Sequence, residues 1–75
     1  MLFPDKLFTY KESVISKFPA VLDVIRIQPI TIKDLYVAVN TEVTGTSEFM
    51  DVLDCLYALG RITLDKDKEV LQYVE

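Results

Sequence analysis

The sequence has no histidine and a single cysteine, Cys55. Histidine is the commonest general base, the usual zinc ligand and the partner that activates serine and cysteine nucleophiles, so its absence removes most familiar catalytic arrangements. One cysteine cannot form an intramolecular disulfide or a cysteine-based metal cluster. The only two glycines, Gly45 and Gly60, cannot form a phosphate-binding loop. We therefore predict no enzyme, and no catalytic, metal-binding or cofactor-binding residue.

Long apolar runs are missing as well. No stretch approaches the ~20 residues needed to span a membrane. The first residues, MLFPDKLF, do not place a basic segment before a long apolar one, so we expect no signal peptide, a cytoplasmic protein and no membrane partner. The charged run DKDKE at residues 65–69 lacks the glycine and the ligand spacing of an EF-hand loop, which indicates a solvated turn rather than a calcium site.

Basic residues are scarce and scattered. Twelve acidic residues face eight basic ones, which gives a net charge of −4. Nucleic-acid binders usually gather lysine and arginine into a patch that displaces counterions from phosphates. Here the lysines are dispersed or alternate with aspartates, namely Lys6, Lys11, Lys17, Lys33, Lys66 and Lys68. The overall charge therefore argues against DNA as the main partner.

Apolar residues, in contrast, are abundant for so short a chain. The 75 residues form one small domain, 51% hydrophobic, with a mean hydropathy of +0.26. A domain of this size buries only about 60% of the surface that its unfolded chain exposes. Either the chain has a rich core, or a partner covers part of its apolar surface.

Two capping boxes predict where helices begin. Thr9 with Glu12, and Thr31 with Asp34, each place a threonine three residues before an acid. They predict a first helical region at residues 10–26, kinked or broken at Pro19, and a second helix at residues 31–39. Pro29 favours extended backbone before it, so we expect a short strand at residues 27–30.

A third helix is predicted at residues 47–59, with Gly60 as its left-handed cap. A spacing of about 100° per residue separates two faces. The inner face would be formed by Phe49, Val52, Leu53, Leu56 and Leu59, and the outer face by Asp51, Asp54, Cys55 and Ala58, with Glu48 and Met50 at the margins. The segment at residues 61–74 alternates as a β-hairpin around a charged turn.

This order of elements predicts a mainly helical α+β fold, a winged helix-turn-helix with three helices and a C-terminal two-stranded wing. A three-helix bundle with a frayed tail is the alternative. Residues 1–9 form an apolar N-terminal arm before the first predicted cap, carrying Leu2, Phe3, Leu7 and Phe8. This arm either packs across the domain or docks into another chain.

Three short stretches of the sequence, in this order and at this spacing, resemble a known family: PDK at 4–6, PITIKDLY at 29–36 and LYALG at 56–60. The chain is similar to the small winged-helix middle components of bacterial ABC-three component systems. The resemblance implies a non-enzymatic adaptor, encoded beside a coiled-coil, SMC-like ABC ATPase and often an effector chain, in systems thought to defend bacteria against phage or foreign DNA. It implies no catalytic residue.

Two functional hypotheses follow. In the first, the chain is an adaptor whose small acidic outer face, Asp51, Asp54, Cys55 and Ala58, meets a protein partner, with Leu2, Phe3 and Phe8 as a second contact surface. In the second, it is a DNA-binding transcriptional regulator, with Lys33, Arg61, Lys66 and Lys68 on phosphates and Ser47, Met50 and Asp51 facing the bases. A second copy of the chain, in a homodimer, is an alternative partner.

Overall fold

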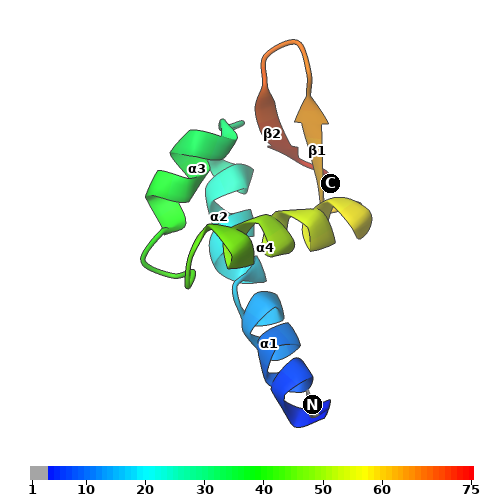
Figure 1. Cartoon of the computed structure of the whole chain (residues 1–75). Helices are drawn as coiled ribbons and strands as arrows, with labels where there is room; N and C mark the ends of the chain where they lie inside the picture. The colour runs from blue at the N-terminus through cyan, green and yellow to red at the C-terminus, as the bar shows by residue number, and fades with distance from the viewer. Residues whose placement is uncertain (1–3) are drawn as a thin grey trace.

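Four helices and one β-hairpin follow one another along residues 4–75, which the computed structural model describes, with the backbone alone for residues 4–8. The elements are α1 (Pro4–Ser16), α2 (Phe18–Ile27), α3 (Ile32–Val39), α4 (Thr46–Ala58), β1 (Ile62–Asp65) and β2 (Val70–Tyr73). Figure 1 shows α2, α3 and α4 as the body of the molecule, with the hairpin at one end and α1 projecting from the other. The molecule is correspondingly long, with extents of 44 × 24 × 19 Å.

The first helical region is broken, not kinked. α1 ends at Ser16, and α2 begins at Phe18 with Lys17 as its N-cap residue. Pro19 is therefore in the first turn of α2, where the N–H that proline lacks would have no partner within the helix. The same residue would interrupt a continuous helix, because its ring clashes with the preceding turn.

The start of α1 corrects the sequence prediction. The arm predicted at residues 1–9 is wrong over its described part, because α1 begins at Pro4 and Thr9 lies inside the helix instead of capping it. Proline is favoured at the first helical position for the same reason as in α2. Residues 1–3, with Leu2 and Phe3, lie outside the described part of the chain.

The start of α3 and the end of α4 follow the predicted signals. Thr31 Oγ1 accepts a hydrogen bond from the Asp34 amide at 3.1 Å, as the capping box predicts. Gly60 has a φ of +74°, and its N–H donates to the Tyr57 carbonyl at 3.0 Å, which closes α4 in a left-handed cap. Leu59, predicted on the buried face, is instead 64% exposed, because α4 ends at Ala58 and the chain turns away.

The strands form an antiparallel hairpin with Leu64 opposite Leu71. The turn between them is held by Asp65 Oδ1, which accepts from the amides of Asp67 and Lys68 at 3.0 and 3.2 Å. Ile30 pairs with Leu71 through two backbone hydrogen bonds of 3.1 and 2.7 Å. The strand predicted at residues 27–30 is reduced to this one bridge, because α2 continues through Ile27.

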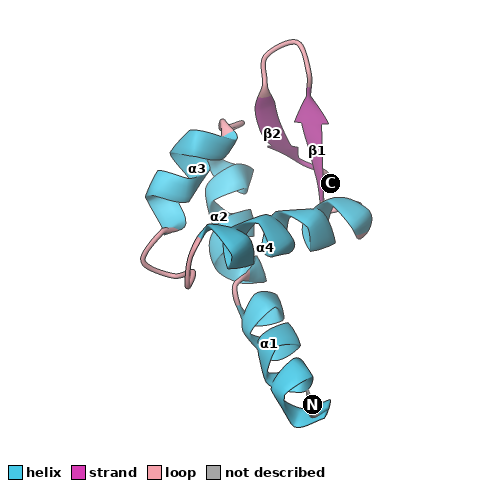
Figure 2. Cartoon of the chain, in the orientation of Figure 1, coloured by secondary structure: helices cyan, strands magenta, loops and turns pink. Residues whose placement is uncertain are grey.

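Figure 2 shows the two strands of the hairpin next to the helical body. One hydrophobic core joins the helices to the hairpin. Tyr36 of α3 packs edge-on against Phe49 of α4, with ring centroids 5.0 Å apart. The buried apolar side chains come from every element, namely Val14, Val21, Ile25, Leu35, Val39, Val43, Phe49, Val52, Leu53, Leu56, Ile62 and Leu71. The hairpin therefore packs as a wing and is not a frayed tail, which excludes the three-helix alternative. The fold is a winged helix-like α+β fold, as predicted, preceded by α1.

Candidate functional site

A groove runs between α1 and α4 and has a volume of about 440 Å³. We call it the α1–α4 groove. The residues that line it are spaced one, three or four positions apart along each helix, so they lie on one face of α1 and one face of α4. α1 contributes Tyr10, Lys11, Val14 and Ile15, and α4 contributes Asp51, Asp54 and Cys55.

The groove is apolar at its base and charged at its rims. Val14 is buried, whereas Ile15 is 58% exposed and Cys55 is also exposed. Lys11 is exposed on the α1 wall, and Asp54 is exposed on the α4 wall. An isoleucine this exposed beside a buried valine is apolar surface that the fold of this chain leaves uncovered.

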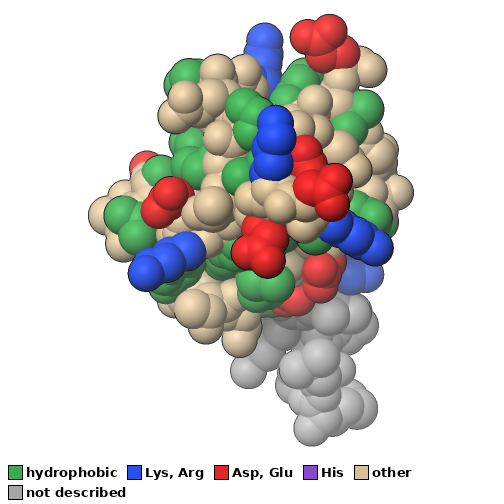
Figure 3. Space-filling view, turned by 90° about the horizontal axis from the view of Figure 1, so that it is seen from above, with side chains coloured by type: hydrophobic (Ala, Val, Ile, Leu, Met, Phe, Trp, Pro, Cys, Tyr) green, Lys and Arg blue, Asp and Glu red, His purple; other side chains and the backbone are tan. Residues whose placement is uncertain are grey.

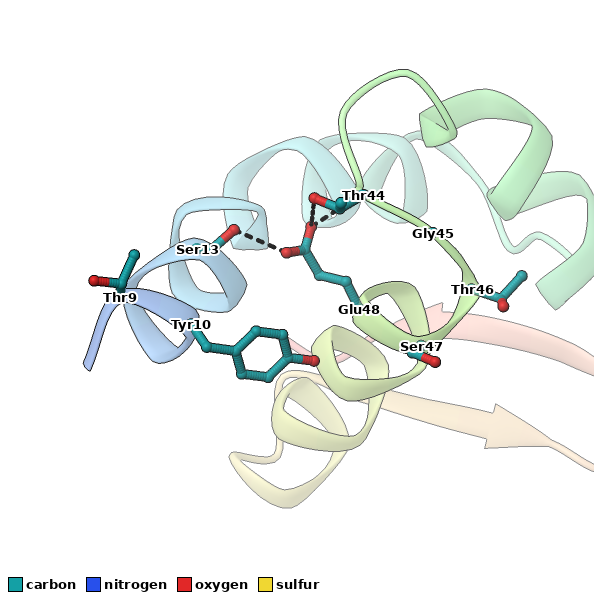
Figure 4. Close-up of a pocket in the computed structure, with 8 residues that line it drawn as sticks. All are labelled: Thr9, Tyr10, Ser13, Thr44, Gly45, Thr46, Ser47 and Glu48. Atoms are coloured by element: carbon teal, nitrogen blue, oxygen red, sulfur yellow. Dashed lines mark hydrogen bonds between the residues drawn. The ribbon is translucent and has the colours of Figure 1, made fainter. Parts of the chain in front are cut away.

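A second hollow, of about 820 Å³, lies at the N-terminal end of α4 (Figure 4). Most of the residues that line it carry a hydroxyl group, and the full lining is Thr9, Tyr10, Ser13, Thr44, Gly45, Thr46, Ser47 and Glu48. Tyr10 lines both hollows. Its hydroxyl donates a hydrogen bond to the carboxylate of Asp51. This bond, followed by desolvation and the negative charge of Asp51, raises the pKa of Tyr10 to about 12.

Glu48 holds α1 against α4. Its side chain is only 5% exposed. Glu48 Oε2 accepts from the Ser13 hydroxyl at 2.8 Å, and Oε1 accepts from the Thr44 amide at 3.0 Å, as Figure 4 shows. Lys17 Nζ lies 3.2 Å from Oε1 and also donates to Ser13 Oγ at 3.1 Å. We call these four residues the Glu48 cluster. It joins α1, the start of α2 and the α3–α4 loop.

The electrostatics of Glu48 are a balance of opposing effects. Burial is the largest of them and by itself raises the pKa of the carboxyl. The hydrogen bonds from Ser13 and Thr44, together with the hydrogen bond and the positive charge of Lys17, outweigh burial and leave the pKa below its ordinary value. Glu48 is therefore charged at neutral pH, and its charge is paired inside the protein.

The structure brings together three of the residues predicted to bind a partner. Asp51, Asp54 and Cys55 line the α1–α4 groove, whereas Ala58 is exposed outside its lining. Phe8 lies on α1, where only the backbone is described, and Leu2 and Phe3 lie outside the described residues.

The sequence reasoning missed the whole α1 wall of the groove and the role of Glu48. The position of Glu48 carried a signal, because it is the third residue of α4, and a glutamate there commonly reaches back to an amide before the helix. No comparable signal existed for α1, because its packing against α4 joins residues that are about 40 positions apart, as Tyr10 and Asp51 are.

As a DNA-reading surface, α4 has the wrong charge. It contains no lysine or arginine, and its outer side carries Asp51 and Asp54. Hydrogen bonding to Tyr10 also places α1 beside the part of the helix that would enter the major groove. On the face shown in Figure 3, lysine and arginine side chains are dispersed among acidic and apolar ones and form no continuous basic surface.

Among residues 9–75, whose side chains the structure describes, no three His, Cys, Asp or Glu side chains are grouped as a metal site. Within residues 4–75, each helix is too short or too polar to cross a membrane.

Comparison with known proteins gives one match. The family model described as ABC-three component (ABC-3C) system Middle Component 7 matches residues 3–71. The match covers α1, the helical body, β1 and the start of β2. Searches of curated proteins and of solved structures gave no match.

Proposed function

The chain belongs to the Middle Component 7 family of ABC-three component systems, and on this basis we propose that it is a non-enzymatic adaptor subunit of a bacterial ABC-type ATPase complex. Its partners on this proposal are a coiled-coil, SMC-like ATPase and an effector chain. The complex would act in the cytoplasm, in defence against phage or other foreign DNA. Membership of a multi-component system supports the part of the proposal that requires protein partners.

The α1–α4 groove is the observation that carries the adaptor role. The helix that reads DNA in other winged-helix proteins is here acidic, and α1 lies beside it. The two helices together present exposed apolar and charged side chains of the kind found in protein interfaces, among them Tyr10, Ile15 and Asp54. An adaptor needs such a surface and needs no chemistry of its own.

The chemistry of the side chains also supports a non-enzymatic role. The sequence has no histidine, and its single cysteine, Cys55, lies in the groove next to Asp54 without a basic neighbour in sequence. Glu48, the buried acid, has all its bonds within the fold, where it connects Ser13, Thr44 and Lys17. A catalytic acid or base needs a carboxyl that can exchange a proton with a substrate, whereas this carboxylate is held by three partners within the fold.

Co-purification tests the proposal directly. The tagged chain is expressed with the ATPase and the effector encoded in its own system, and the products are separated by size-exclusion chromatography with mass measurement. We expect the chain to elute with at least one of the two proteins. Elution of a folded, free chain in the presence of both would overturn the adaptor role.

The winged-helix fold itself favours one other function, the DNA-binding regulator. A titration with duplex DNA at several salt concentrations separates the two. If Z basic side chains contact phosphates, the logarithm of the binding constant falls with the logarithm of the salt concentration with a slope of about −0.9Z. A regulator would therefore lose affinity steeply as the salt concentration rises. We expect no measurable binding of DNA by the free chain.

The defence role has its own test, which is a phage plaque assay on cells that carry the complete system. Deletion of the chain should remove protection, and Glu48→Ala should weaken protection by destabilising the chain. Full protection without the chain would contradict the role in defence and leave its place in the complex unaffected.

A further inference from the structure

We propose that the α1–α4 groove receives one amphipathic helix of a partner subunit, with a basic side chain facing Asp51 and Asp54 and an acidic side chain facing Lys11. This inference rests on the adaptor function proposed above and specifies the chemistry of its partner. Val14 at the base of the groove belongs to the core, and Tyr10 bonds to Asp51 across it. The other side chains that line the groove are exposed, namely Lys11, Ile15, Asp54 and Cys55.

Shape is the first argument for a helix as the occupant. The lining positions on α1 cover about one and a half helical turns, from Tyr10 to Ile15, and those on α4 run from Asp51 to Cys55. Two facing helices with apolar side chains between them accept a third helix by ridge-into-groove packing at about 8–10 Å between axes. An occupant with apolar residues at i, i+3 or i+4, and i+7 would match this length.

Backbone hydrogen bonding is the second argument. Both walls are helical, so most of their backbone N–H and C=O groups along the groove are already paired within each helix. An extended segment lying in the groove would bury its own amides and carbonyls against apolar side chains such as Val14 and Ile15. A helix satisfies those groups internally and buries only side chains, so the groove favours a helix over a strand.

Charge is the third argument, and it orients the occupant. The α4 wall carries two carboxylates, and that of Asp51 is held in place by the Tyr10 hydroxyl. The α1 wall carries the exposed ammonium group of Lys11. A helix with a basic residue on one flank of its apolar stripe and an acidic residue on the other therefore fits in one rotational orientation.

The same charges argue against a second copy of the chain as the occupant. Each copy carries a net charge of −4, so the net electrostatic interaction between two copies is repulsive. A partner segment with basic residues beside its apolar stripe is instead attracted by the negative charge of the chain. We therefore assign the groove to a different protein and make the homodimer an outcome of the test.

Cys55 provides the first experiment, because it is the only thiol of the chain and lies in the groove. The rate of its reaction with a maleimide is measured for the free chain and for the purified complex. We expect a decrease of about tenfold or more on complex formation, since the occupant covers the thiol. An unchanged rate in an intact complex would overturn the groove as the docking site and leave the adaptor function standing.

A benzophenone attached to Cys55 identifies the occupant. On irradiation of the complex, the crosslinked peptide should come from an α-helical segment of the ATPase or effector with lysine or arginine beside its apolar stripe. Crosslinking to an extended segment, to an acidic segment or to a second copy of the chain would contradict the assignment. Failure of any complex to form would overturn the proposed function, and this inference with it.

Matched variants supply the energetic test. Ile15→Glu in the groove should weaken binding by about tenfold or more, whereas Val37→Glu, which alters a similarly exposed side chain on α3, should change it less than about twofold. Asp54→Lys should weaken binding by about three- to tenfold, and Asp23→Lys, on the exposed side of α2, is its control.

Each variant is checked by circular dichroism and by its urea midpoint, so that a loss of binding is compared only among folded chains. A basic-to-acidic change in the crosslinked segment should restore the binding of Asp54→Lys. Equal loss for groove and control variants, or no rescue by the reversed charge, would contradict the proposed orientation.

Discussion

Replacing Glu48 by alanine tests whether the Glu48 cluster fixes α1. The change removes a 5% exposed carboxylate that accepts from Ser13 and Thr44 and pairs with Lys17. Hydrogen bonds to charged groups contribute about 1.5–3 kcal/mol, and removal of one member of a buried ion pair costs about 3–5 kcal/mol. Because the Lys17 side chain is 19% exposed and can turn to water, we expect the lower end, about 3 kcal/mol.

That loss is large for this chain. Seventy-five residues at about 0.05–0.15 kcal/mol each correspond to a free energy of unfolding of about 4–11 kcal/mol. Urea unfolding followed by circular dichroism at pH 7 measures the change, and thermal unfolding should show a midpoint about 12–24 °C lower. The matched control is Glu12→Ala, an exposed glutamate of α1, which should cost less than about 0.5 kcal/mol. Equal losses for Glu48→Ala and Glu12→Ala would refute the reasoning.

Three further predictions concern single residues. The native pKa of Glu48 lies below its ordinary value of 4.5, so the unfolded chain binds more protons than the native chain as the pH falls through that value. The free energy of unfolding of the wild type should therefore fall towards that of Glu48→Gln below about pH 4.5. A difference between the two proteins that does not change with pH would contradict this prediction. Gly60→Ala should lower the free energy of unfolding by about 1–2 kcal/mol in urea titrations, because the φ of +74° is unfavourable for a residue with a Cβ. The cost comes from the backbone alone, since nothing lies within 4 Å of where the Cβ would be. Gly60→Asn should cost less, because asparagine tolerates the left-handed conformation better than alanine. An ultraviolet titration should show one tyrosine that ionises near pH 12, and Tyr10→Phe should remove that component; its persistence would place the perturbed hydroxyl elsewhere.

Much of the fold followed from local signals. Thr31, Pro19 and Gly60 each act through their own backbone or through a partner three residues away, so the sequence contains the information that places them. Thr9 shows the limit of this reasoning. It satisfies the spacing of a capping box, but Pro4 starts a helix five residues earlier, and a residue inside a helix cannot cap it.

The candidate site was only half predictable, for a similar reason. The positions of Asp51, Asp54 and Cys55 on the outer side of α4 follow from the helical period alone. The helical period of α4 alone predicts Glu48 at the margin of the buried face, whereas Glu48 is only 5% exposed in the structure. The difference arises because the period describes one helix and contains no information about α1 packing beside it. The groove exists only because α1 packs there, and its packing depends on Lys17 and Ser13 reaching a carboxylate more than 30 residues away.

The projection of α1 from the body has a consequence for binding affinity. Any occupant of the groove contacts α1 and α4 together, so it binds fully only to molecules in which the two helices are held side by side. If that state is a fraction f of the population, the apparent dissociation constant is the intrinsic one divided by f. The Glu48 cluster lies outside the lining of the groove, and because it bonds α1 to the start of α4 we expect it to raise f. By linkage, an occupant that binds both helices would in turn protect α1 from local unfolding.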